Sequence, residues 1–344
     1  MTKKIVTLSG DGIGPEIMEA GLEVLAAVAE KIGFDYVLEA KDFGGVAIDK
    51  QGLPLPAETL VAAKNADAIL LAAIGHPKYN SAKVRPEQGL LAIRKALGLY
   101  ANVRPLKIYS ELKGLSPIRN VENVDFVVIR ELTGGVYFGE HTLEEDKARD
   151  VNDYTADEIR RILRFAFETA RKRPRKLVTS VDKQNVLATS KLWRKIADEV
   201  ALDYPDVTLE HQLVDSCAML LITNPQKFDV IVTENLFGDI LTDEASSLAG
   251  TLGVMPSSSH GVGGLALYEP IHGSAPDIAG QGIANPVSMI LSVAMMLRES
   301  FELENGATLI ENAVEKTFTD GVLTQDLGGR ATTKEMTDAI LARL

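Results

Sequence analysis

Asp239 and Asp243 stand four residues apart, a spacing at which two carboxylates can act together. They follow a β-branched apolar run, Val230-Ile-Val232, which predicts a buried strand leading into a helix. Like charges at i and i+4 on a helix repel, so we expect a cation beside the pair. Carboxylate oxygens suit Mg²⁺ or Mn²⁺, and Mg²⁺ takes only one or two protein carboxylates. The pair therefore predicts a divalent metal site, with a solvated acidic helix face as the alternative.

Further polar side chains stand where predicted strands end. Lys183 ends the predicted strand 176–183, Asn185 follows it, and Asp215 follows the predicted strand 207–214. In open α/β sheets, ligands collect at the carboxyl ends of the strands. We therefore expect these side chains to border a ligand site.

Arginines are also expected at element ends. Arg104 comes just after Ala101-Asn-Val103, and Arg130 ends the predicted strand 126–129. The planar guanidinium fork pairs bidentately with carboxylates. With Arg94, and with a metal, these side chains would hold a di- or tricarboxylic acid; a surface ion pair is the alternative for each arginine taken singly.

A predicted helix over 86–97 carries Glu87, Leu90, Leu91 and Arg94 at i, i+3, i+4 and i+7, and hence on one face. A stripe that only faced a core would be apolar throughout, whereas this one has a charge at each end. It fits a partly apolar ligand with an acidic end. A boundary helix with solvated ends is the alternative.

Two glycine-rich segments could approach a ligand with their backbone. The segment Gly10-Asp-Gly-Ile-Gly-Pro-Glu16 follows the predicted strand 4–8 and opens a helix to about Lys31. Its G-x-G-x-G spacing differs from the dinucleotide motif G-x-G-x-x-G, so a cofactor loop and a tight turn both stay open. The long loop 267–286 is of a kind that is uncommon unless functional. In it, Asn285-Pro286 predicts the N-cap and first turn of the next helix.

Strands alternate with helices along the chain, which predicts βαβ units and a mostly parallel α/β sheet. Thr155 and Glu158 form a capping box that opens a predicted helix over 156–172. The glycines and aromatics of 131–139 predict a turn into an extended arm, about 137–155. Two interwoven domains are expected from 344 residues. Further predicted elements are strands at 35–39 and 68–72 and helices at 56–65 and 190–204.

The composition narrows the classes of function. The formal net charge of −12 argues against nucleic acid as the main partner. The apolar stretches at 5–8 and 289–297 are too short for a signal peptide or a membrane span, so a cytoplasmic protein without a membrane partner is expected. The single cysteine, Cys217, cannot form an internal disulfide and is interpreted as a buried core residue rather than a redox switch.

Together, in this order, six motifs resemble those of the β-decarboxylating 2-hydroxyacid dehydrogenases, the family of isocitrate and isopropylmalate dehydrogenases. The similarity covers essentially the whole chain. It implies a two-domain fold without a Rossmann dinucleotide-binding unit. The motifs are Gly10–Glu16, Arg85–Leu91, Arg130–Gly139, Val181–Val186, Thr233–Glu244 and His272–Pro286.

The resemblance also implies how the chain is organised. A first domain would comprise 1–99 and 252–344, and a second domain 100–251. The arm would interlock two subunits of a homodimer with shared active sites. Lys183, Asn185 and Asp215 would then come from the second subunit.

The activity implied by the resemblance is NAD-dependent oxidative decarboxylation of a small 2-hydroxy acid. Lys183 would take the hydroxyl proton, alone or with Asp215, because neighbouring cations should lower its pKa. Tyr137 would protonate the product carbon. Mg²⁺ or Mn²⁺ would be bound by Asp215, Asp239 and Asp243.

Other roles carry over position by position. The resemblance implies that the following residues bind the substrate: Glu87, Leu90, Leu91, Arg94, Arg104, Arg130, Asn185, Val186 and Asp215. It places around NAD Ile13, His272, Gly273, Ser274, Ala275, Asp277, Ile278, Asn285 and Asp326. Asp277 favours NAD over NADP, because a carboxylate accepts the ribose 2′-OH and repels a 2′-phosphate.

The third substituent of the substrate decides among members of the family. Leu90 and Leu91 offer an apolar pocket that suits the isopropyl group of 3-isopropylmalate, an intermediate of leucine biosynthesis. Relatives that act on isocitrate typically carry Asn-Thr-Glu where this chain has Leu132-Thr-Gly134. The alternatives are D-malate, tartrate or homoisocitrate as substrate, or a regulatory homologue without turnover. Gln184, Ser216, Cys217, His76 and Tyr79 depart from the usual pattern at positions without a catalytic role.

Overall fold

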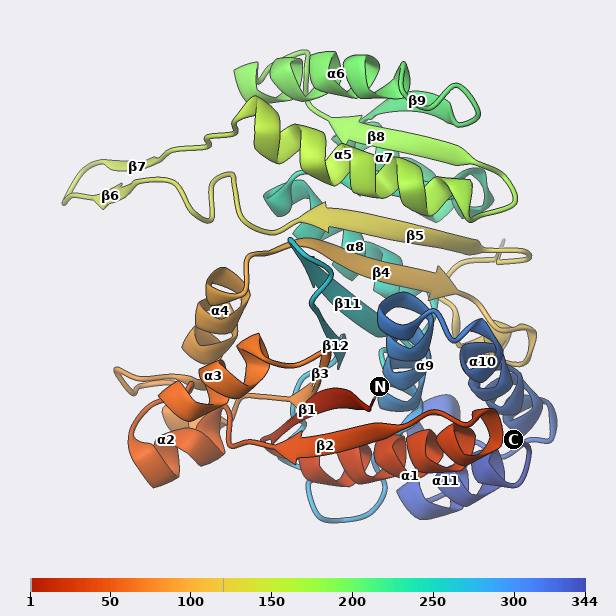
Figure 1. Ribbon diagram of the computed structural model, residues 1–344. Coiled ribbons are helices and arrows are strands. Elements are labelled where there is room, and N and C mark those ends of the chain that lie inside the picture. Colours follow the sequence, from red (N-terminus) through yellow and green to blue (C-terminus); the bar gives the residue numbers. More distant parts are fainter. Residues whose placement is uncertain (1, 120) are drawn as a thin grey trace. The chain divides into compact units, whose positions relative to one another are not determined.

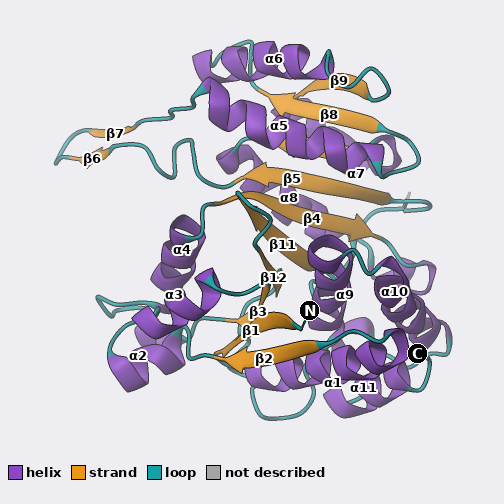
Figure 2. Ribbon diagram, viewed as in Figure 1, coloured by secondary structure: helices purple, strands orange, loops and turns teal. Residues whose placement is uncertain are grey.

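The computed structural model describes residues 2–119 and 121–344. The chain divides into two compact units, one formed by Met1–Leu99 with Thr251–Leu344 and the other by Tyr100–Gly250. Figure 1 colours the first unit red to orange and blue, and the second yellow to teal. Each unit is an α/β layer structure with helices on its sheet (Figure 2). The predicted α/β fold is confirmed.

In the first unit, the strands follow the order β2-β1-β3-β12-β11. β1 pairs in parallel with β2 and β3, and β12 pairs in parallel with β3 and antiparallel with β11. β1 and β3 are buried on both faces and rich in Ile, Val, Leu and Ala, as parallel strands covered by helices are. The strands are β1 (Lys3–Gly10), β2 (Tyr36–Ala40), β3 (Ala68–Ala73), β11 (Pro256–Gly261) and β12 (Ala266–Pro270).

Helices cover the sheet of the first unit on both faces. α1 and α9 contact the strands on one face, and α10 and α11 pack on these helices. On the other face, Val6, Leu8 and Leu71 form a core with Ile93 of α4. α9 is buried on nearly all sides, so its apolar run is core, as the sequence predicted. The helices are α1 (Gly14–Ile32), α2 (Gly45–Gln51), α3 (Ala57–Lys64), α4 (Pro86–Ala96), α9 (Val287–Phe301), α10 (Glu304–Thr319) and α11 (Thr333–Leu341).

In the second unit, the strands follow the order β4-β5-β10-β8-β9. β4 and β5 are antiparallel, and the other pairs are parallel. Parallel pairing brings the ends of β10, β8 and β9 to one edge, where Glu234, Lys183 and Val214 follow. The strands are β4 (Leu99–Lys107), β5 (Asp125–Glu131), β8 (Leu177–Asp182), β9 (Thr208–Leu213) and β10 (Val230–Thr233).

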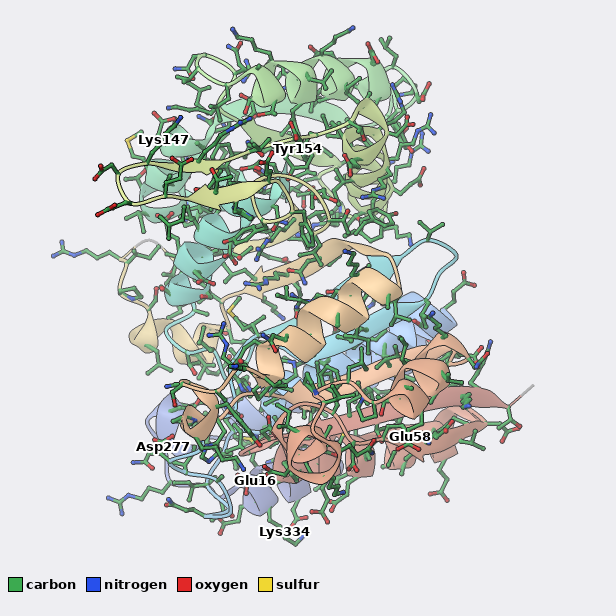
Figure 3. All side chains as sticks on the ribbon, turned by 90° about the vertical axis from the view of Figure 1, so that its left-hand side faces the viewer. Glu16, Glu58, Lys147, Tyr154, Asp277 and Lys334 are labelled. Carbon is green, nitrogen blue, oxygen red and sulfur yellow. The ribbon has the colours of Figure 1, made fainter. Side chains whose placement is uncertain are left out.

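Two helix layers enclose the strands of the second unit. α5 and α6 pack together on one face, and α7 and α8 on the other (Figure 1). The predicted capping box of α5 is present, with Thr155 and Glu158 bonded reciprocally. A hairpin of β6 (His141–Leu143) and β7 (Ala148–Asp150) projects from this unit, with Lys147 near its tip (Figures 1 and 3). The helices are α5 (Ala156–Arg171), α6 (Ala188–Ala201), α7 (Val214–Thr223) and α8 (Asn235–Leu248).

The structure corrects three details of the sequence prediction. The predicted loop 267–286 begins inside strand β12. Arg104 lies within β4, paired with Val128, rather than at an element end. Pro286 rather than Asn285 is the N-cap of α9, although the Asn285 side chain accepts a hydrogen bond from Val287 N–H at 3.0 Å. Among the described residues, no helix is both long and apolar enough to cross a membrane.

Candidate active site

Helix α8 carries both aspartates of the predicted metal site. It begins directly after the buried strand β10, where Glu234 caps it by accepting a hydrogen bond from Phe237 N–H at 3.1 Å. Asp239 and Asp243 lie one turn apart on this helix, as their spacing predicts. The end of β10 and the Glu234 cap therefore determine where α8 begins, and with it the positions of both carboxylates.

Arg130, near the end of β5, forms an ion pair with Asp239. Its Nε and Nη2 atoms donate to Oδ1 of Asn235 at 3.1 and 2.8 Å. Asn235 also donates to the carbonyl of Gly134 at 3.2 Å. At Gly238, a Cβ would fall 2.6 Å from Cγ of Arg130, so only glycine lets the arginine cross the helix this closely. Asn235 therefore orients the guanidinium group toward Asp239.

Tyr137 contacts the same carboxylate from the turn that precedes the arm. Its hydroxyl donates to Oδ2 of Asp239 at 2.7 Å, and the Arg130 guanidinium lies 5.7 Å from its ring centre. The hydrogen bond to the Asp239 carboxylate, with desolvation, raises the pKa of Tyr137 above its usual range. The phenol therefore stays protonated at neutral pH and can act as an acid.

Arg104 lies beside the second aspartate. Its Nη1 atom donates to Oγ1 of Thr242 at 2.8 Å and lies 3.6 Å from Oδ1 of Asp243. Asn102 accepts from its Nε at 2.9 Å. The Asp243 side chain is 80 % exposed. Arginine side chains therefore lie beside both aspartates, and the divalent ion stays a prediction.

Lys183 and Asp215 form a second polar group in this unit. Lys183 directly follows β8, and its Nζ lies 2.7 Å from Oδ1 of Asp215 in the first turn of α7. The hydrogen bond from Lys183 holds the pKa of the Asp215 carboxyl below its usual range. The next residues, Asn185 and Val186, are exposed. β8 and β9 end within one residue of the predicted positions, and the side chains of Lys183 and Asp215 are in contact.

The donor chemistry of α8 fits a hard divalent ion, because Asp239 and Asp243 offer only carboxylate oxygens. Across residues 2–119 and 121–344, no three His, Cys, Asp or Glu side chains gather as a metal-binding group. Asp215 is therefore not brought to the α8 pair within one chain, where it contacts Lys183 instead.

In the first unit, the predicted face of α4 divides into different environments. Glu87 and Leu91 are exposed, and Leu90 packs partly against the core. Arg94 donates to Oε1 of Glu269 at 2.8 Å, and its buried Nε atom has no hydrogen-bond partner within the described part of the chain. Glu269, on β12, was not predicted from the sequence, because no local pattern links residues 175 positions apart.

A cavity of about 510 Å³ lies in the first unit beside the glycine-rich loop. Most predicted cofactor residues line it, namely Ile13, His272, Gly273, Ala275, Ile278, Asn285 and Asp326. Ser274 and Asp277 do not line it; Ser274 is buried and Asp277 is exposed (Figure 3). The lining also includes residues that the sequence reading missed: Thr251, Leu252, Gly253, Ile283, Ala284 and Gln325.

Two polar side chains of this cavity are held in place by neighbours. Oδ2 of Asp326 accepts from Asn285 at 3.0 Å and from Thr251 at 2.9 Å. A Cβ on Gly253 would fall 2.5 Å from that carboxylate oxygen and 2.7 Å from Nδ2 of Asn285. The Asn285–Asp326 pair is therefore preformed, and glycine at 253 leaves room for it.

His272 provides a test of whether this cavity suits a nucleotide. Its Nδ1 lies 2.9 Å from the carbonyl of Gly273 and must carry the proton, which leaves Nε2 as an acceptor. Nε2 is buried and has no partner among the described residues. Burial lowers the pKa of His272, so the ring stays neutral near pH 7. A ligand with an N–H or O–H group, such as an adenine amine or a ribose hydroxyl, fits this atom.

Cys217 lies on α7, two residues after Asp215, and is buried. Burial raises the pKa of its thiol to about 12. A thiol that stays protonated is a poor nucleophile. The structure therefore supports its interpretation as a core residue.

Known proteins are similar to this chain over nearly its whole length. The family model described as isocitrate/isopropylmalate dehydrogenase matches residues 4–340. The chain is 83 % identical to the 3-isopropylmalate dehydrogenase of Lactococcus lactis subsp. lactis, over 99 % of both chains. It is 73 % identical to that of Streptococcus thermophilus, over the full length of both.

Solved structures of related dehydrogenases also match the whole chain. An isocitrate dehydrogenase from Methylococcus capsulatus matches with a TM-score of 0.88 and 38 % identity, covering 100 % of this chain and 99 % of the other. A β-decarboxylating dehydrogenase from Thermococcus kodakarensis, in its apo form, matches with a TM-score of 0.86 and 38 % identity, covering 100 % and 96 %. The chain belongs to the isocitrate/isopropylmalate dehydrogenase family.

Proposed function

We propose that the chain oxidises 3-isopropylmalate with NAD and decarboxylates the product to 4-methyl-2-oxopentanoate, a reaction of leucine biosynthesis. The observation that carries this proposal is the 83 % identity to a 3-isopropylmalate dehydrogenase along 99 % of both chains. The geometry adds support, since a protonated tyrosine and an arginine converge on the carboxylate of Asp239.

The arginines of the second unit are proposed to bind the carboxylates of the substrate. Arg130 is held by Asn235 through two donors, so its remaining nitrogen, Nη1, has a fixed direction. Arg104 is held in the same way by Asn102 and Thr242. Planar forks fixed from behind lose little entropy when they pair with a carboxylate. Val186, with Asn185 and Asp215 of the second subunit, is proposed to complete the substrate contacts.

The first unit is proposed to supply the apolar contact and a third arginine. Leu91 is 58 % exposed on α4, although it is a large apolar side chain. It would gain from contact with an isopropyl group, as would the half-buried Leu90. Glu87 and Arg94 lie at the two ends of this face.

Two protons move in the proposed reaction. Lys183, in its neutral form, takes the proton of the substrate hydroxyl while the hydride leaves the carbon that bears this hydroxyl for NAD. The ammonium group that results donates a hydrogen bond to Asp215, as in the pair seen at 2.7 Å. A divalent ion held by Asp239 and Asp243, when bound, stabilises negative charge on the substrate oxygen. After CO₂ leaves, Tyr137 gives its phenolic proton to the carbon that carried it. The raised pKa of Tyr137 suits this role, because the acid must be protonated when the enolate forms.

NAD is the proposed cofactor, placed in the cavity beside the glycine-rich loop. Asp277 is exposed, so its carboxylate can reach a ribose hydroxyl at the cavity's margin. His272, Asn285 and Asp326 are proposed to contact the adenosine half. A 2′-phosphate near Asp277 would be repelled, which favours NAD over NADP.

A homodimer with shared sites is also proposed. Asp239 and Asp243 form one group and Lys183 with Asp215 another, and the second subunit would bring them together. Mixing Lys183→Ala chains with Asp239→Asn chains should then restore one intact site in each heterodimer. If the mixture stays as inactive as either parent, the groups do not combine across subunits.

Isocitrate is a less suitable substrate for this site. A side chain at position 134, where relatives acting on isocitrate typically carry glutamate, would meet Tyr154, since a Cβ there falls 2.6 Å from the tyrosine ring. The test is turnover of 3-isopropylmalate, isocitrate, D-malate and tartrate with NAD or NADP, with and without Mg²⁺. We expect preference for 3-isopropylmalate with NAD. Preference for isocitrate with NADP would contradict the proposal.

A further inference from the structure

The motif Gly10-Asp-Gly-Ile-Gly-Pro-Glu16 is packed against other backbone segments of the first unit. A Cβ on Gly10 would fall 1.9 Å from the carbonyl oxygen of Ala73, and a Cβ on Gly12 would fall 2.0 Å from that of Ser274. Both glycines have positive φ, +69° and +57°. These glycines therefore allow close contact with the protein's own chain.

Asp11 lies inside this contact and is 9 % exposed. Its Oδ2 accepts hydrogen bonds from the backbone N–H groups of Gly45 and Gly75, at 2.8 and 2.9 Å. Its Oδ1 accepts from Val46 N–H at 2.9 Å. One buried carboxylate thus ties the end of β1 to the first turn of α2 and to the loop after β3, both far away in sequence.

Ser274 extends the same network into the cofactor loop. Its hydroxyl donates to the carbonyl of Gly75, and its own carbonyl accepts from Ile13 N–H at 2.8 Å. Ser274 does not line the cavity, whereas its neighbours Gly273 and Ala275 do. Because its hydroxyl hydrogen is used inside the protein, its effect on a ligand must come through the position of those neighbours.

Gly75 takes part in the hydrogen bonds of both Asp11 and Ser274. Its N–H is held by Asp11 and its carbonyl by Ser274. Its φ of +107° is a conformation that glycine adopts readily and other residues do not. A Cβ at this position would fall 3.1 Å from Oε1 of Glu87, in the first turn of α4. Gly75 therefore touches both the cofactor loop and the beginning of the predicted substrate helix.

We propose that Asp11 and Ser274 are positioning residues that, through Gly75, hold the cofactor loop against the first turn of α4. The inference rests on the proposed function, since it assumes that the cavity takes the dinucleotide. The network fixes the wall formed by Ile13, Gly273 and Ala275 before the ligand arrives. A preformed wall spares the ligand the cost of ordering a loop, so losing the network weakens binding.

The first test is the variant Ser274→Ala, titrated with NADH and followed by nucleotide fluorescence. The carbonyl of Gly75 loses its buried donor, and we expect the dissociation constant to rise about tenfold, with a larger effect on KM for NAD than on kcat. The matched control is Ser292→Ala, which removes a buried hydroxyl that donates to the Ser288 carbonyl at 2.8 Å in the same unit. The control should bind NADH within about twofold of the unmodified chain.

A second pair of variants separates the Gly75 contact from the charge of Asp11. In Asp11→Asn, the amide oxygen can take the place of Oδ2 and keep the hydrogen bonds from the N–H groups of Gly45 and Gly75. Only the hydrogen bond from Val46 N–H is lost. Asp11→Ala loses all three acceptors. The dissociation constant for NADH should therefore rise in two steps, by about threefold in Asp11→Asn and by more than about tenfold in Asp11→Ala.

The outcomes distinguish this inference from the proposed function. If the unmodified chain does not bind NADH, the proposed function fails. If it binds NADH, and Ser274→Ala binds as tightly as Ser292→Ala, only the positioning role is overturned. Equal losses in Asp11→Asn and Asp11→Ala would also overturn it. Should Asp11→Ala fail to fold, Ser274→Ala with its control still decides.

Discussion

The cavity beside the glycine-rich loop and helix α8, the proposed sites of the cofactor and of the metal, differ in how their polar groups are already paired. The cavity is lined mainly by glycine and apolar residues, and its Asp326 is held by neutral donors. The Nε2 atom of His272 has no hydrogen-bond partner among the described residues. On α8, the carboxylate of Asp239 is already engaged by Arg130 and Tyr137. A neutral ligand part can enter the cavity without breaking contacts, whereas a ligand at α8 must exchange partners with charged groups.

This difference gives a physical reason for proposing a metal at α8 and not in the cavity. Arginine and carboxylate groups satisfy each other on α8, so a substrate carboxylate that takes Arg130 leaves Asp239 without its counterion. A divalent ion would restore the balance of charge. In the cavity, Asp326 already accepts hydrogen bonds from Thr251 and Asn285, and the described lining contains no arginine that a ligand could draw away from a carboxylate.

The largest effect is expected from Asp239→Asn. The substitution removes the negative charge that faces Arg130 and Tyr137, and we expect metal-dependent turnover to fall by about a thousandfold. Turnover at a series of Mg²⁺ concentrations measures it. The control is Asp203→Asn, which removes an exposed carboxylate 3.3 Å from Arg164 in the same unit and should change the rate little. A near-normal rate for Asp239→Asn would exclude that residue from the site.

Tyr137→Phe should slow turnover by about ten- to a hundredfold, because the phenolic proton is no longer available. Hydride transfer should be less affected, since it precedes protonation in the proposed sequence. A single-turnover experiment that follows NADH formation and CO₂ release separately distinguishes the two steps. Unchanged overall turnover would mean that another group donates the proton.

Asn235→Ala tests whether Arg130 is aimed by its neighbour. Loss of the two hydrogen bonds at 3.1 and 2.8 Å should raise KM for 3-isopropylmalate about tenfold. The dissociation constant for NADH should stay near that of the unmodified chain, which shows that the first unit is intact. Equal losses in both would indicate a general loss of structure.

The sequence predicted most of the strands and long helices, because their apolar periodicity and caps are local. Thr155 with Glu158, for example, opens α5 where expected. Short elements without a clear period were missed, including α2 and β11. Arg104 was misplaced at an element end, since nothing in Ala101-Asn-Val103 marks a strand that continues beyond it.

The candidate site was predicted unevenly, for a physical reason. Asp239 and Asp243 could be found by their spacing on a helix. The contacts between Arg94 and Glu269, and between Ser274 and Gly75, join residues far apart in the chain and leave no periodic signal. Such contacts depend on the tertiary fold, which a single sequence does not display.

His272 should make a smaller contribution, seen in how the free energy of unfolding depends on pH. Burial lowers its pKa in the folded chain, while the unfolded chain titrates near the usual value of about 6.5. Below that pH the unfolded state binds more protons, so the free energy of unfolding falls as the pH is lowered. Denaturant unfolding at pH 7 and pH 5 should show a weaker pH dependence in His272→Asn. An equal dependence would mean that His272 is not buried as a neutral ring.

Cys217 should have the smallest effect of all. With its pKa raised to about 12, the thiol should not react with an alkylating reagent at pH 8 in the native chain, and should react after unfolding. Activity should be unchanged by exposure to the reagent. Rapid labelling of the native chain would show that α7 opens or that the thiol is accessible.

Calorimetric titration with and without Mg²⁺ tests the contrast between the two regions most directly. We expect the dissociation constant for NADH to be the same within about twofold in Mg²⁺ and in EDTA, because the cavity needs no added charge. That for 3-isopropylmalate should rise at least about tenfold in EDTA, because α8 then lacks its counterion. Equal metal dependence for both ligands, or none for 3-isopropylmalate, would contradict this account.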